Sequence, residues 1–86
     1  MSNLDPFVAI ADPHRRHLLE ALRRAPKTVN ELASGLPISR PAVSQHLKAL
    51  LDCNLVTVTS EGTRRIYSVN RQGFDRLNLW LDQFWS

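Results

Sequence analysis

The sequence lacks features that several large classes of protein require. It contains one cysteine, Cys53, among 86 residues, which excludes an internal disulfide framework and favours a reducing compartment. No apolar run is long enough to cross a bilayer, and the N-terminus carries no signal-peptide pattern. We therefore expect a cytoplasmic protein that has no membrane partner.

Signatures of catalysis are also missing. The sequence contains no nucleophile–base constellation, no glycine-rich loop that would cradle a phosphate, and no carboxylate pair in a recognisable context. Internal repeats and low-complexity tracts are absent as well. The sequence therefore predicts a protein that is not an enzyme and needs no cofactor.

The composition that is present suits one small globular domain spanning residues 1–86, because 43% of the residues are hydrophobic. Positive charge is concentrated in the middle of the chain. Residues 39–71 hold five Lys or Arg and two Asp or Glu, a net of +3, whereas residues 1–38 have a net of +1 and residues 72–86 a net of −1. Local basic surplus of this kind is typical of nucleic-acid binding.

The central prediction is a helix that begins after Ser39 and ends near Asn54. The Ser39 hydroxyl is a suitable N-cap, and Pro41 falls in the first turn, where a missing N–H costs little. Asn54 tolerates the left-handed conformation that often ends a helix.

This helix has two chemically different faces. Val43, Leu47 and Leu50 recur at helical spacing and are predicted to pack on a core. The opposite face carries hydrogen-bonding side chains without an acidic residue, which suits base edges in a major groove. Its members are Arg40, Ser44, Gln45 and Lys48.

Helices are also predicted before this segment. Residues 4–11 form a short first helix, and Asp12-Pro13 begins a second helix that runs to about Arg24. Residues 28–31 match a capping box for a short third helix, and Gly35 ends it. Two short helices joined by a tight turn, the second with a polar face, predict a helix-turn-helix.

A β-hairpin is predicted after Asn54. Residues 55–59 and 65–69 alternate and are rich in β-branched side chains, with a turn over residues 60–63. The basic tip would reach a phosphate backbone or the minor groove; the alternative is a solubilising turn. The residues assigned to this contact are Thr63, Arg64 and Arg65.

The last helix, predicted from Gln72 to the end, is too apolar for one buried face. Its uncovered side would suit a second copy of the chain related by a two-fold axis, although a wholly buried stripe is the alternative. Residues 1–11 and 72–86 are therefore assigned to a homodimer interface. The side chains assigned to it are Phe7, Ile10, Leu77, Trp80, Leu81, Phe84 and Trp85.

Several motifs together resemble one family. A-D-P-H-R-R at 11–16, L-L-E-A-L at 18–22, S-R-P-A-V-S-Q-H-L-K at 39–48 and R-R-I-Y at 64–67 resemble the ArsR-type bacterial transcriptional repressors. The resemblance implies a mainly α, winged helix-turn-helix fold with the order α-α-α-α-β-β-α. It also implies a homodimer that binds a two-fold symmetric DNA operator, often with autorepression. By position it assigns DNA contact to Ser39, Arg40, Pro41, Ser44, Gln45 and His46.

Side-chain chemistry refines these assignments. Gln45 suits adenine and Arg40 suits guanine, whereas Ser39, Ser44 and Lys48 suit phosphates. The position of His46 between the two faces leaves both a packed and a phosphate-contacting role open.

The chain departs from the metal-sensing members of the family. Thr28 and Asn30 stand where those members carry two cysteines, and the last helix has no histidine. His14 and His17 could share an ion, but two ligands are too few for a stable site. Cys53 is interpreted as a structural thiol, with a redox switch as the alternative. We therefore predict no metal site.

The resulting prediction is a sequence-specific double-stranded DNA-binding regulator, a homodimeric repressor or autorepressor without a metal-sensing site. One alternative is a metal- or ligand-gated sensor repressor of the same fold. Another is a winged-helix module that binds protein and not DNA.

Overall fold

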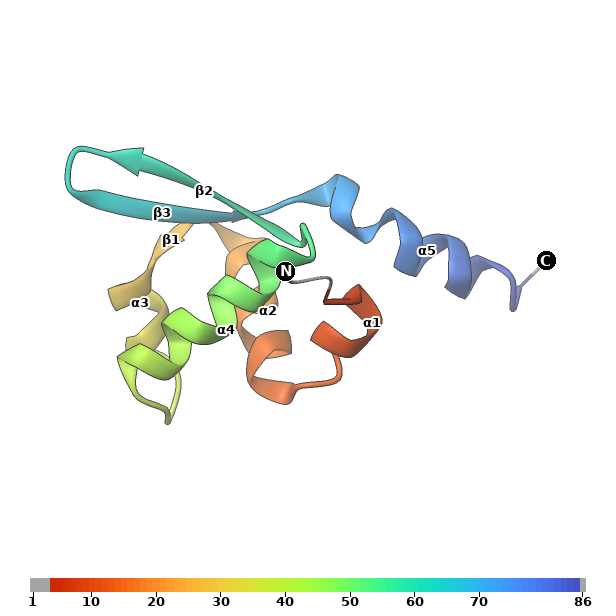
Figure 1. The fold of residues 1–86 in the computed structure, drawn as a ribbon, viewed down its shortest axis with the longest axis horizontal. Helices are drawn as coiled ribbons and strands as arrows, with labels where there is room; N and C mark the ends of the chain where they lie inside the picture. Colours follow the sequence, from red (N-terminus) through yellow and green to blue (C-terminus); the bar gives the residue numbers. More distant parts are fainter. Residues whose placement is uncertain (1–3, 86) are drawn as a thin grey trace.

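The computed structural model describes residues 4–85; residues 1–3 and 86, the outer ends of the two assigned interface segments, lie outside it. Four helices precede a hairpin and a fifth follows it (Figure 1), which confirms the predicted winged helix-turn-helix. No helix in this range is long and apolar enough to span a membrane. The helices are α1 (Pro6–Ala9), α2 (Pro13–Arg24), α3 (Val29–Ser34), α4 (Arg40–Asp52) and α5 (Asp75–Asp82), with a 3-10 turn η1 (Arg71–Phe74) before α5. The strands are β1 (Lys27–Thr28), β2 (Val56–Glu61) and β3 (Arg64–Val69).

Strand β1 was not predicted from the sequence. It pairs antiparallel with β3, so that Lys27 lies opposite Tyr67 and Thr28 opposite Ile66, and the sheet order is β1-β3-β2. Two residues are too few to show an alternating pattern, so only pairing with a distant strand defines this one. The pairing places the start of α3 beside the hairpin.

The predicted caps begin the helices of the helix-turn-helix. The Glu31 backbone N–H donates to Thr28 Oγ1 at 3.3 Å, and the Thr28 N–H donates to Glu31 Oε1 at 2.8 Å, which completes the capping box. Ser39 Oγ accepts from the Ala42 N–H at 3.3 Å. Local hydrogen bonds therefore set where α3 and α4 begin.

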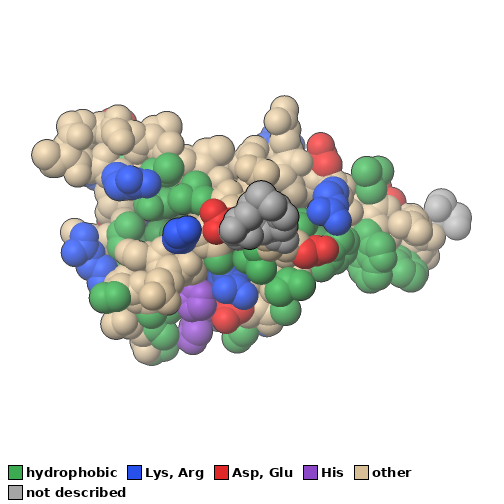
Figure 2. Space-filling view, viewed as in Figure 1, with side chains coloured by type: hydrophobic (Ala, Val, Ile, Leu, Met, Phe, Trp, Pro, Cys, Tyr) green, Lys and Arg blue, Asp and Glu red, His purple; other side chains and the backbone are tan. Residues whose placement is uncertain are grey.

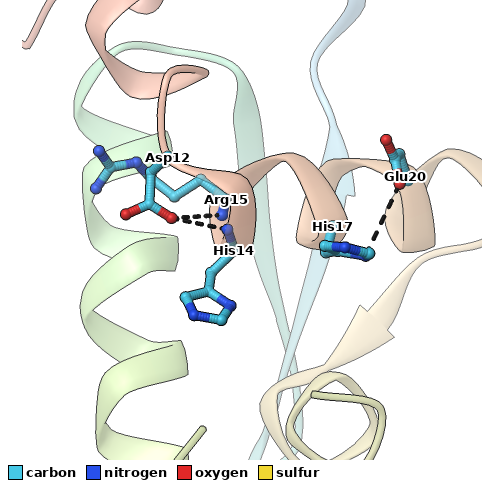
Figure 3. Close-up of polar contacts among 5 residues, drawn as sticks. All are labelled: Asp12, His14, Arg15, His17 and Glu20. Atoms are coloured by element: carbon cyan, nitrogen blue, oxygen red, sulfur yellow. Dashed lines mark hydrogen bonds and ion pairs between the residues drawn. The ribbon is translucent and has the colours of Figure 1, made fainter. Parts of the chain in front are cut away.

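The cap of α2 has a pH-dependent component. One Asp12 carboxylate oxygen accepts from the backbone N–H groups of His14 and Arg15 at 2.8 and 3.2 Å (Figure 3). Desolvation by burial acts to raise the pKa of Asp12, but these two hydrogen bonds and the charges of His46 and Arg15 outweigh it, so the pKa lies below its ordinary value. The charged form is therefore favoured by folding.

We expect Asp12→Ala to lower the free energy of unfolding by about 1 kcal/mol at neutral pH, because the N-cap acceptor is lost. The contribution of the wild-type charge is fully present above the unfolded pKa of about 3.9 and is lost as pH falls through the lower folded pKa. Urea denaturation from pH 7 down to pH 3 measures both effects. Asp12→Asn is the control, since it keeps an acceptor but should lose this part of the pH dependence.

The inner face of α4 forms the centre of the core. Val43, Leu47 and Leu50 have no exposed surface, which confirms the predicted apolar stripe. The same cluster contains Leu18 of α2 and Leu55, which follows α4. Helix α2 lies behind part of α4 in Figure 1. Burial on one side therefore fixes which face of α4 remains open to a partner.

The end of α4 is tied to the segment that leads into α5. Asn54 adopts the predicted left-handed conformation, with φ of 64°. Its carbonyl oxygen accepts from Asn70 Nδ2 at 3.0 Å, and the Asn70 backbone N–H donates to the Leu55 carbonyl at 2.9 Å. Gly73 packs so closely that a Cβ there would lie 1.7 Å from the Asn54 oxygen.

The structure corrects the predicted extent and faces of the last helix. Helix α5 ends at Asp82, short of the chain end. Leu77, Trp80 and Leu81 are spaced three or four apart and so share one side of the helix, yet Leu77 is buried while Trp80 and Leu81 are exposed. Leu77 is only 6% exposed and belongs to the core of the protomer, so little of its side chain is available for the predicted dimer contact. The later side chains remain exposed because α5 extends beyond the body of the domain (Figure 1).

Candidate nucleic-acid interface

The outer face of α4 presents the polar side chains predicted to contact DNA. Ser44, Gln45 and Lys48 are exposed along the helix, and Arg40 and Pro41 are exposed at its start. The Lys48 ammonium lies 3.9 Å from an Asp52 carboxylate oxygen, a surface pair whose lysine is 76% exposed. Such pairs are weak, so the lysine remains able to contact a phosphate.

A cleft of about 340 Å³ lies between the starts of α3 and α4 and the hairpin. It brings together residues from two regions predicted to contact DNA, the start of α4 and the tip of the hairpin, which are more than 20 positions apart in sequence. All its charged lining residues are arginines, which suits an anionic group such as a phosphate. The lining residues are Thr28, Val29, Asn30, Arg40, Thr63, Arg64 and Arg65.

Asn30 and Thr28 were not predicted at this interface. They line the cleft because the unpredicted β1–β3 pairing places the start of α3 against the hairpin. Glu31 lies beside them, and hydrogen bonds from the backbone N–H and hydroxyl of Thr28 lower the pKa of its carboxyl, with smaller effects from Lys27 and Arg64. Its negative charge is therefore held next to the cleft by the α3 cap.

The hairpin presents its basic residues at an exposed tip. Gly62 has φ of 61°, a left-handed conformation that suits glycine and closes the two-residue turn. Arg64 pairs across from Glu61 in the strand register, and Thr63, Arg64 and Arg65 are all exposed. The tip, which we call the wing, projects from the body of the domain in Figure 1.

The three histidines do not gather at one point. His46 is half-buried beside His14, with ring centroids 5.9 Å apart, which favours the packed role over a phosphate contact. His17 instead lies 3.9 Å from Glu20, and Figure 3 shows its ring joined to Glu20 and apart from the His14 ring. Among residues 4–85, no three His, Cys, Asp or Glu side chains are placed to hold a metal ion.

The remaining candidate for reactive chemistry is Cys53. Its side chain is buried, and the thiol donates to the Leu50 carbonyl oxygen at 3.5 Å. Burial raises the pKa of this thiol, despite opposing backbone hydrogen bonds and the charge of Arg15. A neutral, covered thiol fits the structural role better than the redox role.

A hydrophobic surface lies at the opposite end of the molecule. In Figure 2, hydrophobic side chains gather over α5 at the right, whereas Lys and Arg side chains are scattered over this face on both sides of the view. Phe7 and Ile10 of the assigned interface are half-buried against the core. The Trp80 ring packs edge-on against the rings of Phe7 and Phe84, with distances between ring centroids of 5.5 and 4.9 Å. We call the exposed residues the α5 surface: Val8, Leu79, Trp80, Leu81, Phe84 and Trp85. Val8 and Leu79 were not predicted.

Comparison with known proteins adds family information to this geometry. Residues 12–58 match the family described as "Bacterial regulatory protein, arsR family". The chain is 49% identical over 78 residues to the HTH-type transcriptional regulator Rv2034 of Mycobacterium tuberculosis, covering 91% of this chain and 73% of that protein. It is 41% identical over 63 residues to a probable mercury resistance operon repressor of Streptomyces lividans, covering 73% of this chain and 50% of the relative.

Solved structures show the same fold. The crystal structure of a possible transcriptional regulator for arsenical resistance superposes with a TM-score of 0.87 at 41% identity, covering 96% of this chain and 86% of the other. A homodimeric winged helix-turn-helix DNA-binding domain from Mycobacterium bovis gives a TM-score of 0.72 at 26% identity, covering 88% and 70%. The chain therefore belongs to the ArsR family, as a transcriptional regulator with a winged helix-turn-helix DNA-binding domain and not as an enzyme.

Proposed function

We propose that the protein is a cytoplasmic homodimer that binds a two-fold symmetric DNA operator and represses transcription, including that of its own gene. One observation carries this proposal. Arg40 of α4 and Arg64 and Arg65 of the wing line one cleft without an acidic lining residue, next to the exposed polar face of α4. This arrangement offers phosphate contacts and base-edge contacts side by side.

Individual roles follow from side-chain chemistry. Gln45 and Arg40 contact base edges in the major groove, since their side chains can form two hydrogen bonds with adenine and guanine respectively. The wing contacts the sugar–phosphate backbone or the minor groove. Ser39, Ser44 and Lys48 contact phosphates, and Pro41 and His46 lie within the same segment without an assigned hydrogen bond.

Dimerisation through the α5 surface would supply the two-fold symmetry. The protomer is 45 Å along its longest axis, with the wing at one end and α5 at the other (Figure 1). Pairing at α5 therefore leaves both α4 helices free, so that they can enter successive major grooves about 34 Å apart. The structural neighbour from Mycobacterium bovis is homodimeric, which supports a homodimer for this chain.

Repression without metal sensing is the form of regulation we infer. The Streptomyces lividans relative is named an operon repressor, which supports repression. Its name also refers to mercury, but Thr28 of this chain has no thiol, and its hydroxyl and backbone are engaged by the α3 cap and strand β1. Asn30, the other position, also lacks a thiolate.

The Arg64→Ala, Arg65→Ala double variant tests the function. The dimer would lose four phosphate contacts, two in each protomer, and each should reduce the slope of log affinity against log salt by about 0.9, so we expect a reduction of about 3.6. Affinity should also fall for all DNA sequences. Fluorescence anisotropy with the DNA upstream of the protein's own gene, at 50 to 200 mM salt, measures both quantities. If the wild-type protein binds no DNA even at low salt, the protein-interaction module is the better account.

Gln45→Ala is the matched comparison for base recognition. This side chain carries no charge, so the salt slope should stay unchanged. Discrimination should fall by about 1–3 kcal/mol at one base position in each half-site. Binding to a set of single-base operator variants measures this loss, and an equal loss on every variant would argue against a base contact by Gln45.

A further inference from the structure

Two adjoining clefts lie on α2, the end of β3 and η1, and they use no residue of α3, α4, the wing tip or the α5 surface. The first has a volume of about 290 Å³ and almost entirely apolar walls; the second has about 390 Å³. The first is lined by Leu19, Glu20, Arg23, Val69 and Phe74, and the second by Leu22, Arg23, Arg24, Ala25, Pro26, Ser68, Val69 and Arg71. Since Arg23 and Val69 line both, the two clefts are direct neighbours.

Positive charge surrounds the second cleft. Arg23, Arg24 and Arg71 are exposed, and none forms an ion pair with another residue of the described chain. Arg23 and Arg24 occupy the last turn of α2, where they also complement the negative end of the helix dipole. Arg71 belongs to η1, so the helix dipole of α2 does not explain why this arginine lies at the cleft.

Negative charge lines only the first, apolar cleft. Glu20 is the single acidic lining residue of the pair of clefts, and it lies 3.9 Å from His17. Glu20 lines only the first cleft, whereas Arg24 and Arg71 line only the second, so the second cleft is the better place for an anionic group. An apolar body would then lie in the first cleft.

We propose that these clefts form a binding site for a small organic carboxylic acid with an apolar body. Leu19, Val69 and Phe74 contact the aliphatic or aromatic part, which gains free energy by leaving water. The carboxylate contacts Arg24 and Arg71, because guanidinium groups bind carboxylates through charge-assisted hydrogen bonds. The volumes fall near the lower end of small-molecule sites, roughly 300–1,000 Å³.

The site would contact the segment that leads into the predicted dimer helix. Phe74 is the last residue of η1, directly before α5, and Gly73 beside it packs on the end of α4. The proposal itself concerns binding of the acid and does not depend on DNA recognition. It can therefore fail or succeed separately from the proposed function.

Octanoate is the probe for the test, and 1-octanol is its uncharged counterpart. Isothermal titration calorimetry on the full chain should give saturable octanoate binding that is at least tenfold tighter than binding of 1-octanol. Arg71→Gln should raise the Kd for octanoate about tenfold, as expected for loss of a hydrogen bond to a charged group, and leave 1-octanol unchanged. Arg65→Gln, an exposed wing arginine, is the matched control and should leave octanoate binding unchanged.

Methyl NMR locates the bound probe. Chemical-shift changes should concentrate at Leu19, Leu22 and Val69. Changes centred on Leu79 and Leu81 would show adsorption to the α5 surface and overturn the proposal. The proposal is also overturned if octanoate binds no better than 1-octanol, or if Arg71→Gln leaves octanoate binding unchanged. Binding by a monomeric variant alone would overturn it as well, because a second copy of the chain would then cover the clefts in the dimer.

Discussion

Leu81→Glu is expected to convert the proposed dimer into a folded monomer. The Leu81 side chain is 44% exposed on the α5 surface beside Trp80, Phe84 and Trp85, so dimerisation would bury the new carboxylate without a partner. An unpaired buried charge costs several kcal/mol. Loss of the second half-site contact should then weaken binding to a two-site operator by roughly 10²–10⁴-fold. Sedimentation and fluorescence anisotropy measure the two effects.

Gln83→Glu is the control for this variant. It introduces the same charge two residues later, at an exposed polar position that does not itself belong to the α5 surface, and should remain dimeric. Circular dichroism checks that both variants are folded. A folded Leu81→Glu protein that still sediments as a dimer would place the interface elsewhere.

Gly73→Ala is expected to destabilise the fold by about 3 kcal/mol or more, because the added Cβ would meet backbone and not a flexible side chain. The Cβ would lie 1.7 Å from the Asn54 carbonyl oxygen and 3.2 Å from the Leu55 Cα. Relief would require movement of η1 away from the end of α4, against the two hydrogen bonds of Asn70. For a domain of this size, the melting temperature should fall by roughly 12–24 °C.

Gly35→Ala is the matched comparison. Gly35 has φ of −98°, and the nearest atom to its added Cβ is the Leu32 carbonyl oxygen at an ordinary 3.7 Å. We expect a change within about 0.5 kcal/mol. Urea and thermal denaturation of both variants test the contrast, and equal losses would mean that Gly73 is not closely packed against Asn54.

Much of the fold could be predicted because its signals are local. The capping box at Thr28 and Glu31 and the left-handed Asn54 each depend on a few neighbouring residues. The inward stripe of α4 needs only the helical period, which is why burial of Leu47 and Leu50 agreed with the pattern.

The errors concern contacts between distant segments. Strand β1 exists because it pairs with β3, nearly 40 residues later. The amount of core available to cover α5 is a property of the whole domain, so the sequence could not tell that Leu77 is covered while Leu81 is not. The close approach of Gly73 to Asn54 likewise has no local signal.

The sequence by itself determined the order of the elements, the polar face of α4 and the surplus of positive charge, because propensity, periodicity and side-chain chemistry are encoded residue by residue. Only the tertiary structure decided that Arg40 and the wing arginines line one cleft, and that the carboxyl-terminal aromatic residues extend past the core. The physical reason is that a shared cleft and an uncovered surface arise from packing between segments far apart in the chain, which no local pattern records.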